Sequence, residues 1–282
     1  MDAREKKRRA AKASLEFIEP GMTVGIGTGS TVNELIELLP SISDRIDKVV
    51  SSSRASTELL QQKGFSVSRL NEVGPLDVYI DGADEATKRL HLIKGGGGAL
   101  TREKVLAGAA RRFVCIVDET KLVGMLGKFP LPVEVIPMAQ SFVARQFTKL
   151  RAQPVWREGF VTDNGNHILD VHGLNISNPL EMETRLNQIP GILTVGIFAH
   201  RSADILLIAD YGKGVCTWRR DLPGREGFLL LAAAHHGVDR RSAPEAADEV
   251  LTPLLHGVVA GPARRPPTQR ELWQILNDIE AL

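Results

Sequence analysis

Short runs rich in valine and isoleucine alternate with helical stretches between residues 22 and 126, and this alternation constrains the fold most. Strands are predicted at 23–27, 48–50, 65–70, 76–80 and 112–117, and helices at 32–39 and 55–63. Such an order is typical of a mostly parallel, doubly wound sheet with helices on both faces. These sheets bind ligands beyond the carboxyl ends of their strands, so polar residues that directly follow strands are the first candidates for a site.

The pattern changes after residue 126. A proline-punctuated extended run at 128–137 precedes a predicted helix at 139–150. Two alternating runs then flank Asn164-Gly165, which is a strong hairpin signal. A helix at 179–188 and a strand at 193–198 follow, and this β-α-β-β-α-β order predicts a smaller α+β domain of the split βαβ, ferredoxin-like type. A strand at 205–209 is expected to return to the first sheet.

These patterns predict three parts. Residues 1–126 plus 202–217 form a catalytic α/β domain, residues 127–201 a small α+β domain, and residues 218–282 a C-terminal extension that is partly helical or disordered. The extension differs in composition, because Lys213 is the last lysine and six of the 15 prolines lie beyond Cys216. After a linker at 264–268, an amphipathic helix is predicted at 269–282.

Composition excludes several classes of protein. A net charge of +1 gives no overall field for binding nucleic acid or an anionic membrane. No apolar run approaches the roughly 20 residues that span a bilayer, and the basic start lacks the apolar stretch of a secretory signal. Two cysteines make no disulfide framework and fit a reducing compartment, so a cytoplasmic location is predicted. His235, His236 and His256 lack the spacing of metal ligands, so no metal is expected.

The first chemical motif is the glycine-rich turn at 25–31, which follows a strand and opens a helix. Its glycines allow a tight turn, and the helix start offers unpaired N–H groups with the positive end of the dipole. Hydroxyls of Thr28, Ser30 and Thr31 add donors, so the turn predicts a phosphate cradle. The alternative is a merely tight turn. The motif lacks the last glycine of the dinucleotide fingerprint and the Gly-Lys-Ser/Thr ending of a P-loop.

The second motif is the acidic sequence at 81–85, directly after the strand at 76–80. Crowding Asp81, Asp84 and Glu85 at one strand end is costly without a purpose. A turn or helix-capping cluster would explain Asp84 alone. A pair of metal-binding carboxylates is a further alternative, although Lys94 would compete with a metal as the counter-ion.

The third motif is the lysine and four glycines at 94–98, followed by a helix that carries Glu103. Apolar runs flank the glycines closely, so a free linker is a poor explanation, and backbone laid against a ligand is a better one. Lys94 would then supply positive charge at an oxygen. Glu103 would lie one turn into the helix and face back over the loop, although a lone glutamate on a helix is more often solvated.

Several strings, in order, resemble the type A ribose-5-phosphate isomerases from about residue 10 to residue 217: GIGTGSTV, SSSRAST, DGADE, KGGGGALTREK, LGKFPLPVEVIPMA, VTDNGN and ILDVHG. The resemblance implies an aldose–ketose isomerase of the non-oxidative pentose phosphate pathway (EC 5.3.1.6). Such an enzyme interconverts ribose 5-phosphate and ribulose 5-phosphate through a cis-enediol. It also implies that the enzyme needs no metal or cofactor and forms a homodimer or homotetramer.

The resemblance further implies roles for individual residues. Glu103 would be the general base, Asp81 would assist ring opening, and Lys94 would stabilise the developing oxyanion. Gly98 departs from the family, since many members carry alanine there, but the site depends on backbone at this position. The residues implied in substrate binding are Thr28, Gly29, Ser30, Thr31, Asp81, Gly82, Ala83, Asp84, Lys94, Gly95, Gly96, Gly97, Lys121 and Lys7.

Two other functions compete with this interpretation. An amino-sugar phosphate deaminase on a similar scaffold usually needs a catalytic histidine, and the acidic and glycine-rich motifs contain none. His91 is more simply structural. A non-catalytic sugar-phosphate sensor would keep the turn at 28–31 but could lose Glu103 and Lys94. Both residues are present, which favours the isomerase.

Overall fold

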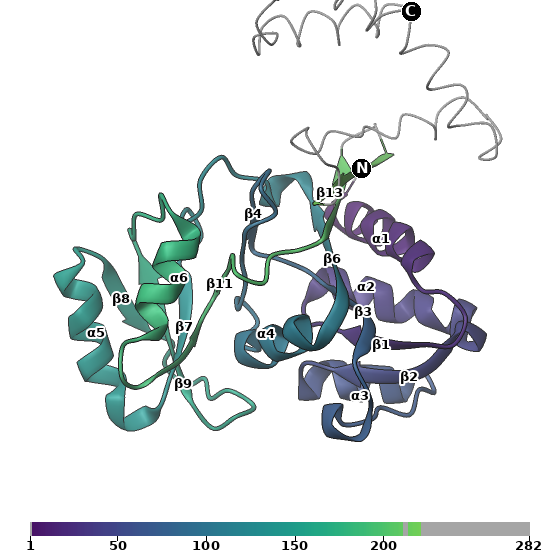
Figure 1. The fold of residues 1–282 in the computed structure, drawn as a ribbon, viewed down its shortest axis with the longest axis horizontal. Helices are drawn as coiled ribbons and strands as arrows, with labels where there is room; N and C mark the ends of the chain where they lie inside the picture. The colour runs from purple at the N-terminus through teal and green to yellow at the C-terminus, as the bar shows by residue number, and fades with distance from the viewer. Residues whose placement is uncertain (1, 211–213, 221–282) are drawn as a thin grey trace, which may run out of the picture. The chain divides into compact units, whose positions relative to one another are not determined.

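The computed structural model describes residues 2–210 and 214–220, and its largest sheet has six strands (Figure 1). The strands are β1 (Met22–Ile26), β2 (Ile46–Ser51), β3 (Leu76–Asp81), β6 (Ala110–Asp118), β12 (Ile205–Asp210) and β13 (Gly214–Arg219). Their order across the sheet is β13-β12-β6-β3-β1-β2. Every neighbouring pair is parallel except β12 and β13, which are antiparallel. The predicted doubly wound, mostly parallel sheet is confirmed.

Helices bury both faces of this sheet. They are α1 (Ala3–Ser14), α2 (Ser30–Leu38), α3 (Arg54–Gln62) and α4 (Leu100–Ala109). One face packs in a core with α1, α2 and α3, to which β1 contributes Val24 and Ile26. The other face packs with α4, and Tyr79 and Phe113 are its largest buried side chains. Burial on both faces explains why the strand sequences are continuously apolar rather than alternating.

A four-stranded antiparallel sheet forms between residues 131 and 195. Its elements are β7 (Leu131–Val135), α5 (Gln140–Lys149), β8 (Gln153–Trp156), β9 (His167–His172), α6 (Pro179–Asn187) and β10 (Ile192–Val195). The strand order β10-β7-β9-β8 is that of a split βαβ unit, as predicted. Val143 and Phe147 of α5 and Leu186 of α6 pack in the core of this sheet.

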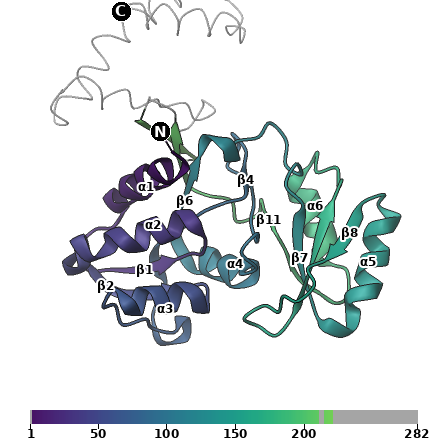
Figure 2. The ribbon, with the colours of Figure 1, turned by 180° about the vertical axis from the view of Figure 1, so that it is seen from behind.

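A short three-stranded sheet connects the two larger ones. It consists of β4 (Glu85–Ala86), β5 (Leu92–Ile93) and β11 (Ile197–Phe198), in the order β11-β5-β4. Leu92 and Phe198 lie in the core beneath α4, whereas Ile93 and Ile197 lie in the core of the four-stranded sheet. Helix α4 packs against strands of both larger sheets, and Figures 1 and 2 place it between them. Short 3-10 helices complete the described chain at Leu15–Phe17, Leu39–Arg45, Leu70–Glu72, Glu119–Lys121 and Pro137–Ala139.

Two predicted elements of local structure are wrong. The strand predicted at 65–70 is reduced to a single bridge between Val67 and Val49, because the chain turns away into the 3-10 helix at Leu70–Glu72. The hairpin predicted around Asn164-Gly165 is displaced, since its first strand, β8, ends at Trp156. Residues 157–166 form a loop instead, whose turn is closed by backbone hydrogen bonds between Thr162 and both Gly165 and Asn166 and by the Thr162 hydroxyl. The predicted strand at 193–198 is divided at Gly196 into β10 and β11.

The sheet continues past the predicted start of the extension. Trp218 pairs with Leu206 in the β12–β13 ladder and is buried, and the backbone N–H of Arg220 donates to the carbonyl of Asp204 at 3.0 Å. The division into domains at 1–126 plus 202–217, 127–201 and 218–282 stays a prediction. The helix predicted at 269–282 lies outside the described residues, as do His235, His236 and His256.

Candidate active site

Asp81 lies where the carboxyl ends of the adjacent strands β1 and β3 meet, and its carboxylate is fully buried. Its Oδ1 accepts hydrogen bonds from the backbone N–H of Thr28 at 3.0 Å and of Gly82 at 2.7 Å. Its Oδ2 accepts one from the hydroxyl of Tyr79. A Cβ at Gly27 would lie 1.9 Å from the Asp81 Cγ, so only glycine lets the first strand-end turn approach this carboxylate.

Lys94 connects Asp81 with Glu103. The Lys94 Nζ lies 2.7 Å from Asp81 Oδ2 and 3.3 Å from Glu103 Oε2, and it donates to the Gly82 carbonyl at 2.6 Å. Each of the three charged side chains is at most 3% exposed. The short sheet fixes the lysine backbone, since the Lys94 N–H donates to the Gly196 carbonyl at 2.9 Å. Glu103 lies in the first turn of α4, as expected.

Burial and charge set the protonation of this group. Burial raises the pKa of Glu103 to about 8, where Lys94 opposes the rise and Asp81 adds to it. Burial lowers the pKa of Lys94, but the Asp81 and Glu103 carboxylates outweigh it and hold that pKa above its ordinary value. Within the described chain, the buried Glu103 Oε2 has no hydrogen-bond donor other than the Lys94 ammonium with which it pairs. A carboxyl with a pKa near neutrality and one such partner suits proton transfer.

The glycine-rich turn opens α2. Gly29 has a φ of +118°, and no side chain caps the N-terminus of this helix, which begins at Ser30. Thr31 is half-buried and Ser30 is exposed, so both stand at the open end of the helix. The unpaired N–H groups of this first turn, together with the positive end of the helix dipole, can bind an anion.

The glycine loop that follows Lys94 is fixed from one side by the acidic motif. Asp84 Oδ2 accepts the Gly96 N–H at 2.8 Å, and a Cβ on Gly96 would lie 2.5 Å from Asp84 Oδ1. Gly95 is buried with a φ of +108°, whereas Gly96 and Gly97 are exposed and can face a ligand. Gly82 and Ala83, which connect Asp81 with Asp84, are half-buried. The acidic motif and the glycine loop therefore form one continuous surface of backbone and carboxylates.

Lys7 and Lys121 come from neighbouring segments. Lys7 is on α1, and Lys121 ends the 3-10 helix at Glu119–Lys121. The buried Lys6 forms an ion pair with Glu119, which brings these two segments into contact. Both predicted substrate lysines are half-buried, and neither forms a hydrogen bond or ion pair with another described residue. The structure therefore leaves their role in binding substrate as a prediction.

Comparisons with known proteins identify the family. The sequence family described as ribose 5-phosphate isomerase A (phosphoriboisomerase A) matches residues 48–212, more than half of the chain. The chain belongs to this family. It is an isomerase that interconverts ribose 5-phosphate and ribulose 5-phosphate. The earlier resemblance, which was based on short motifs, is thereby confirmed.

Solved structures of other ribose 5-phosphate isomerases share the fold. The enzyme from Neisseria gonorrhoeae is 47% identical, with a TM-score of 0.74 over 77% of this chain and 96% of that chain. The enzyme from Methanocaldococcus jannaschii is 37% identical, with a TM-score of 0.73 over 78% of this chain and 100% of that chain. A third, described as a complex with phospho-erythronic acid, is 39% identical, with a TM-score of 0.74 over 78% of this chain and 100% of that chain.

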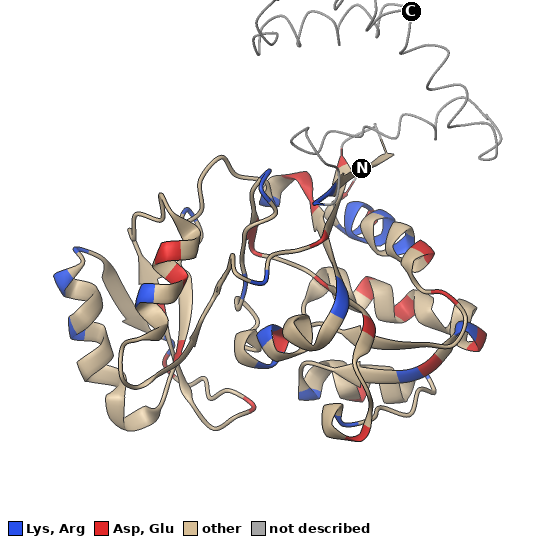
Figure 3. Ribbon diagram, in the orientation of Figure 1, with Lys and Arg blue, Asp and Glu red and all other residues tan. Residues whose placement is uncertain are grey.

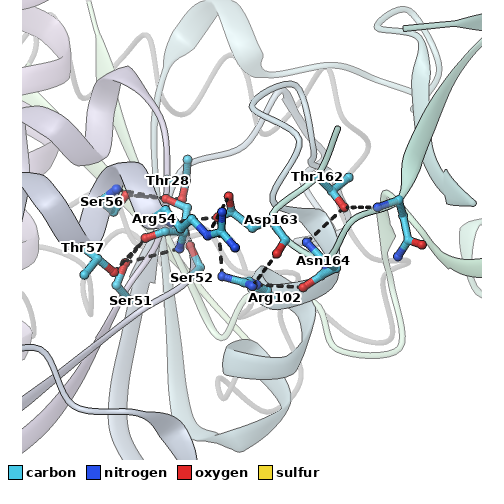
Figure 4. A network of polar contacts seen from close by, with 12 residues as sticks. Thr28, Ser51, Ser52, Arg54, Ser56, Thr57, Arg102, Thr162, Asp163 and Asn164 are labelled. Carbon is cyan, nitrogen blue, oxygen red and sulfur yellow. Dashed lines mark hydrogen bonds and ion pairs between the residues drawn. The ribbon is translucent and has the colours of Figure 1, made fainter. Parts of the chain in front are cut away.

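Three residues to which the sequence analysis assigned no role contact the predicted site residues. Thr28 Oγ1 contacts the hydroxyls of Ser52 at 2.9 Å and Ser56 at 3.3 Å, and Ser56 donates to the Gly27 carbonyl at 2.8 Å (Figure 4). Ser52 follows β2 directly, so the strand-end rule could have found it, whereas Ser56 lies in the first turn of α3. Tyr79, which donates to Asp81, gave no such signal because it lies inside an apolar strand.

The arginines of α1 form ion pairs with neighbouring carboxylates. Figure 3 shows basic residues along α1, but Arg4 and Arg8 pair with Glu34, and Arg9 pairs with Glu5. Within residues 2–210 and 214–220, no three His, Cys, Asp or Glu side chains gather in a way that could hold a metal ion. No helix in that part of the chain is long and apolar enough to cross a bilayer.

Proposed function

We propose that Glu103 is the base that carries the proton between C2 and C1 of the open-chain sugar. The observation that carries this proposal is the buried Oε2 of Glu103, which lies 3.3 Å from the Lys94 ammonium and has no other hydrogen-bond donor in the described chain. In the forward reaction Glu103 takes the C2 proton of the aldose while O1 takes up a proton, which gives a cis-enediol. Glu103 then returns its proton to C1 while the C2 hydroxyl gives up its proton, which replaces the one taken up at O1, and the ketose forms.

Lys94 stabilises the charge that develops on the sugar oxygen during this transfer. A proton on carbon beside a carbonyl is weakly acidic, so the oxyanion needs a fixed positive partner in a site with little water. The raised pKa of Lys94 keeps its ammonium charged there. The N–H of the exposed Gly97 adds a donor at the same oxygen.

Asp81 opens the sugar ring before isomerisation. Ribose 5-phosphate is mostly a closed ring, so one group must move protons between the ring oxygen and the anomeric hydroxyl. The Asp81 carboxylate is held by Thr28, Gly82 and Tyr79 beside the ammonium of Lys94, and this fixed position next to the proposed oxyanion partner supports the role.

The substrate is placed by its phosphate. The phosphate binds at the turn of Thr28, Gly29, Ser30 and Thr31, with Lys7 and Lys121 beside it, and the sugar hydroxyls meet residues 81–84. Lys94 and residues 95–97 hold the reacting end. The open N-terminus of α2 supports this placement of the phosphate. The relative described in complex with phospho-erythronic acid, a phosphorylated sugar acid, supports a sugar phosphate as the ligand. Binding energy from the phosphate then orients the reacting carbons.

Replacing the base tests the assignment. Glu103→Gln keeps the shape of the side chain but cannot accept a proton, so we expect kcat to fall by about 10²–10⁴-fold with little change in substrate binding. Turnover of ribose 5-phosphate and exchange of solvent deuterium into C1 of the ketose should fall together. Glu58→Gln, an exposed glutamate on α3, is the matched control. A kcat near that of wild type in Glu103→Gln would show that another group is the base.

Side chains supply every proton-transfer group in this mechanism, so we propose that the isomerase needs no metal or cofactor and remains active in EDTA. The family resemblance supports a homodimer or homotetramer in the cytoplasm, with no nucleic acid or membrane as partner. Size-exclusion chromatography with light scattering distinguishes the two assemblies.

We also keep the domain division at 1–126 plus 202–217, 127–201 and 218–282 as a proposal.

A further inference from the structure

The loop between β8 and β9, residues 157–166, reaches from the four-stranded sheet to the segments that form the active site (Figure 4). Its first contact is with the helix that carries the base. Arg102, the residue before Glu103, donates to Asn164 Oδ1 at 2.8 Å and to the Asp163 carbonyl at 2.9 Å. The Arg102 guanidinium also lies 3.5 Å from Asp163 Oδ2.

The same carboxylate contacts the side of the site that is proposed to bind phosphate. Asp163 Oδ2 accepts the backbone N–H of Arg54 at 2.8 Å, at the start of α3, and the Arg54 side chain lies 3.8 Å from Asp163 Oδ1. Helix α3 carries Ser56, which bonds to Thr28 and to the Gly27 carbonyl. Asp163 therefore connects the helix of the base with the support of the glycine-rich turn.

The start of the loop holds the third segment, the glycine loop. Arg157 donates to the Gly96 carbonyl at 3.1 Å and to the Gly95 carbonyl at 3.3 Å, while a bidentate ion pair to Asp170 fixes its guanidinium. The ring of Phe160 occupies the space that a side chain at Gly98 would need, since a Cβ there would lie 2.2 Å from the ring. Glycine at position 98, where this chain departs from the family, therefore leaves room for the ring of Phe160.

A buried carboxylate anchors the loop itself. Glu134 of β7 has no exposed surface, and it accepts hydrogen bonds from Thr162 at 2.8 Å, Asn166 at 3.0 Å and Asn164 at 3.1 Å. It also accepts one from Thr101, two residues before Glu103 on α4. A buried network with these partners satisfied rigidifies its surroundings, so the loop and the start of α4 are held as one body.

We propose that the loop at 157–166 is a positioning element that sets the geometry of Glu103 relative to the glycine loop and the phosphate turn, and that Asp163 is its key residue. This inference rests on the proposed role of Glu103. Asp163 touches no reacting atom and acts through Arg102 and Arg54. Because displacing a reacting group by about 1 Å can cost 10²-fold in rate, removing these contacts lowers turnover without removing a catalytic group.

Asp163→Ala is the test, with Asp163→Asn as the conservative variant. Asp163 is 27% exposed, so both variants should fold, which circular dichroism checks. We expect Asp163→Ala to lower kcat roughly tenfold while KM changes less than twofold, because the geometry of the chemical step is disturbed more than binding. Asp163→Asn keeps an oxygen acceptor for the Arg54 N–H and should recover most of the lost kcat.

The control is Glu37→Ala, which removes the exposed ion pair between Glu37 and Lys63 and should leave kcat unchanged. Arg157→Lys provides a second variant, since lysine keeps the charge but cannot bind Asp170 and two carbonyls together, and its kcat should also fall. If Asp163→Ala and Arg157→Lys both fold and both keep the kcat of wild type, the proposal is overturned. If Glu103→Gln is inactive in the same assay, this outcome refutes only the positioning role of the loop, and Glu103 remains the base.

Discussion

The proposed chemistry depends on an excess of negative charge at three residues. Asp81 and Glu103 share one ammonium, that of Lys94, in a buried site. Desolvation and the second carboxylate disfavour ionisation of Glu103, and Lys94 compensates only in part, so its pKa rises to about 8. Two carboxylates and one cation thus make one group that can hold a proton or release it near neutral pH.

This shift predicts how stability changes with pH. Between the ordinary glutamate pKa of about 4.3 and the folded value of about 8, the folded chain holds a proton on Glu103 that the unfolded chain has lost. The folded state therefore binds more protons, and stability falls as pH rises through this window. Glu103→Gln lacks this penalty, so its melting temperature should exceed that of wild type by a margin that grows from pH 5 to pH 8.

Thermal melts at pH 5, 7 and 9 measure that margin, and Glu58→Gln should follow wild type at every pH. The kcat/KM of wild type should rise with pH up to about 8, because a base must be ionised to act. A gap in melting temperature that does not change with pH would show that Glu103 titrates as an ordinary glutamate.

At the scale of elements, the sequence predicts the strand ends well because each has a local signal. Apolar runs mark β1 and β3, and the glycines and carboxylates that follow them mark the turns of the site. The contacts of Asp163 and Glu134 carry no such signal. Arg54 and Asp163 are 109 residues apart, and only the packed fold brings them together. The strands of the three-stranded sheet are also too short, at two residues each, to show periodicity.

Gly196, between β10 and β11, holds the backbone of Lys94 in place. Its N–H donates to the Pro132 carbonyl at 2.8 Å, and its carbonyl accepts the Lys94 N–H. A Cβ at this position would lie 2.3 Å from the Lys94 carbonyl oxygen and 3.0 Å from that of Pro132. Both atoms are backbone and cannot move aside at low cost.

We therefore expect Gly196→Ala to lower the free energy of unfolding by about 1–3 kcal/mol and to reduce kcat by displacing Lys94. Urea unfolding and steady-state kinetics measure both effects. Gly108→Ala, near the end of α4 with nothing within 4 Å of the added Cβ, is the matched control. It should leave kcat unchanged and add at most about 0.5 kcal/mol of stability. Equal stabilities of the two variants would contradict the role of Gly196.

At the scale of the whole molecule, we expect the fold and the proposed site to need only the part of the chain up to Arg220. Every residue assigned a role at the site lies between Lys7 and Gly196. The match to the Neisseria gonorrhoeae structure covers 96% of that chain but 77% of this one. Among the described residues, β13 is the last strand of the sheet; Trp218 is buried there, and Arg220 pairs with Asp204 at 3.6 Å.

A chain that ends at Arg220 should therefore keep kcat/KM within about twofold of the full chain. A chain that ends at Thr217 loses Trp218 from the core and should be less stable by roughly 1.5–3 kcal/mol, the usual contribution of a large buried side chain. Kinetics, urea unfolding and light scattering on the two truncated chains and the full chain measure activity, stability and assembly separately. If the chain ending at Arg220 is folded but inactive, residues 221–282 contribute to catalysis or to an assembly that catalysis requires.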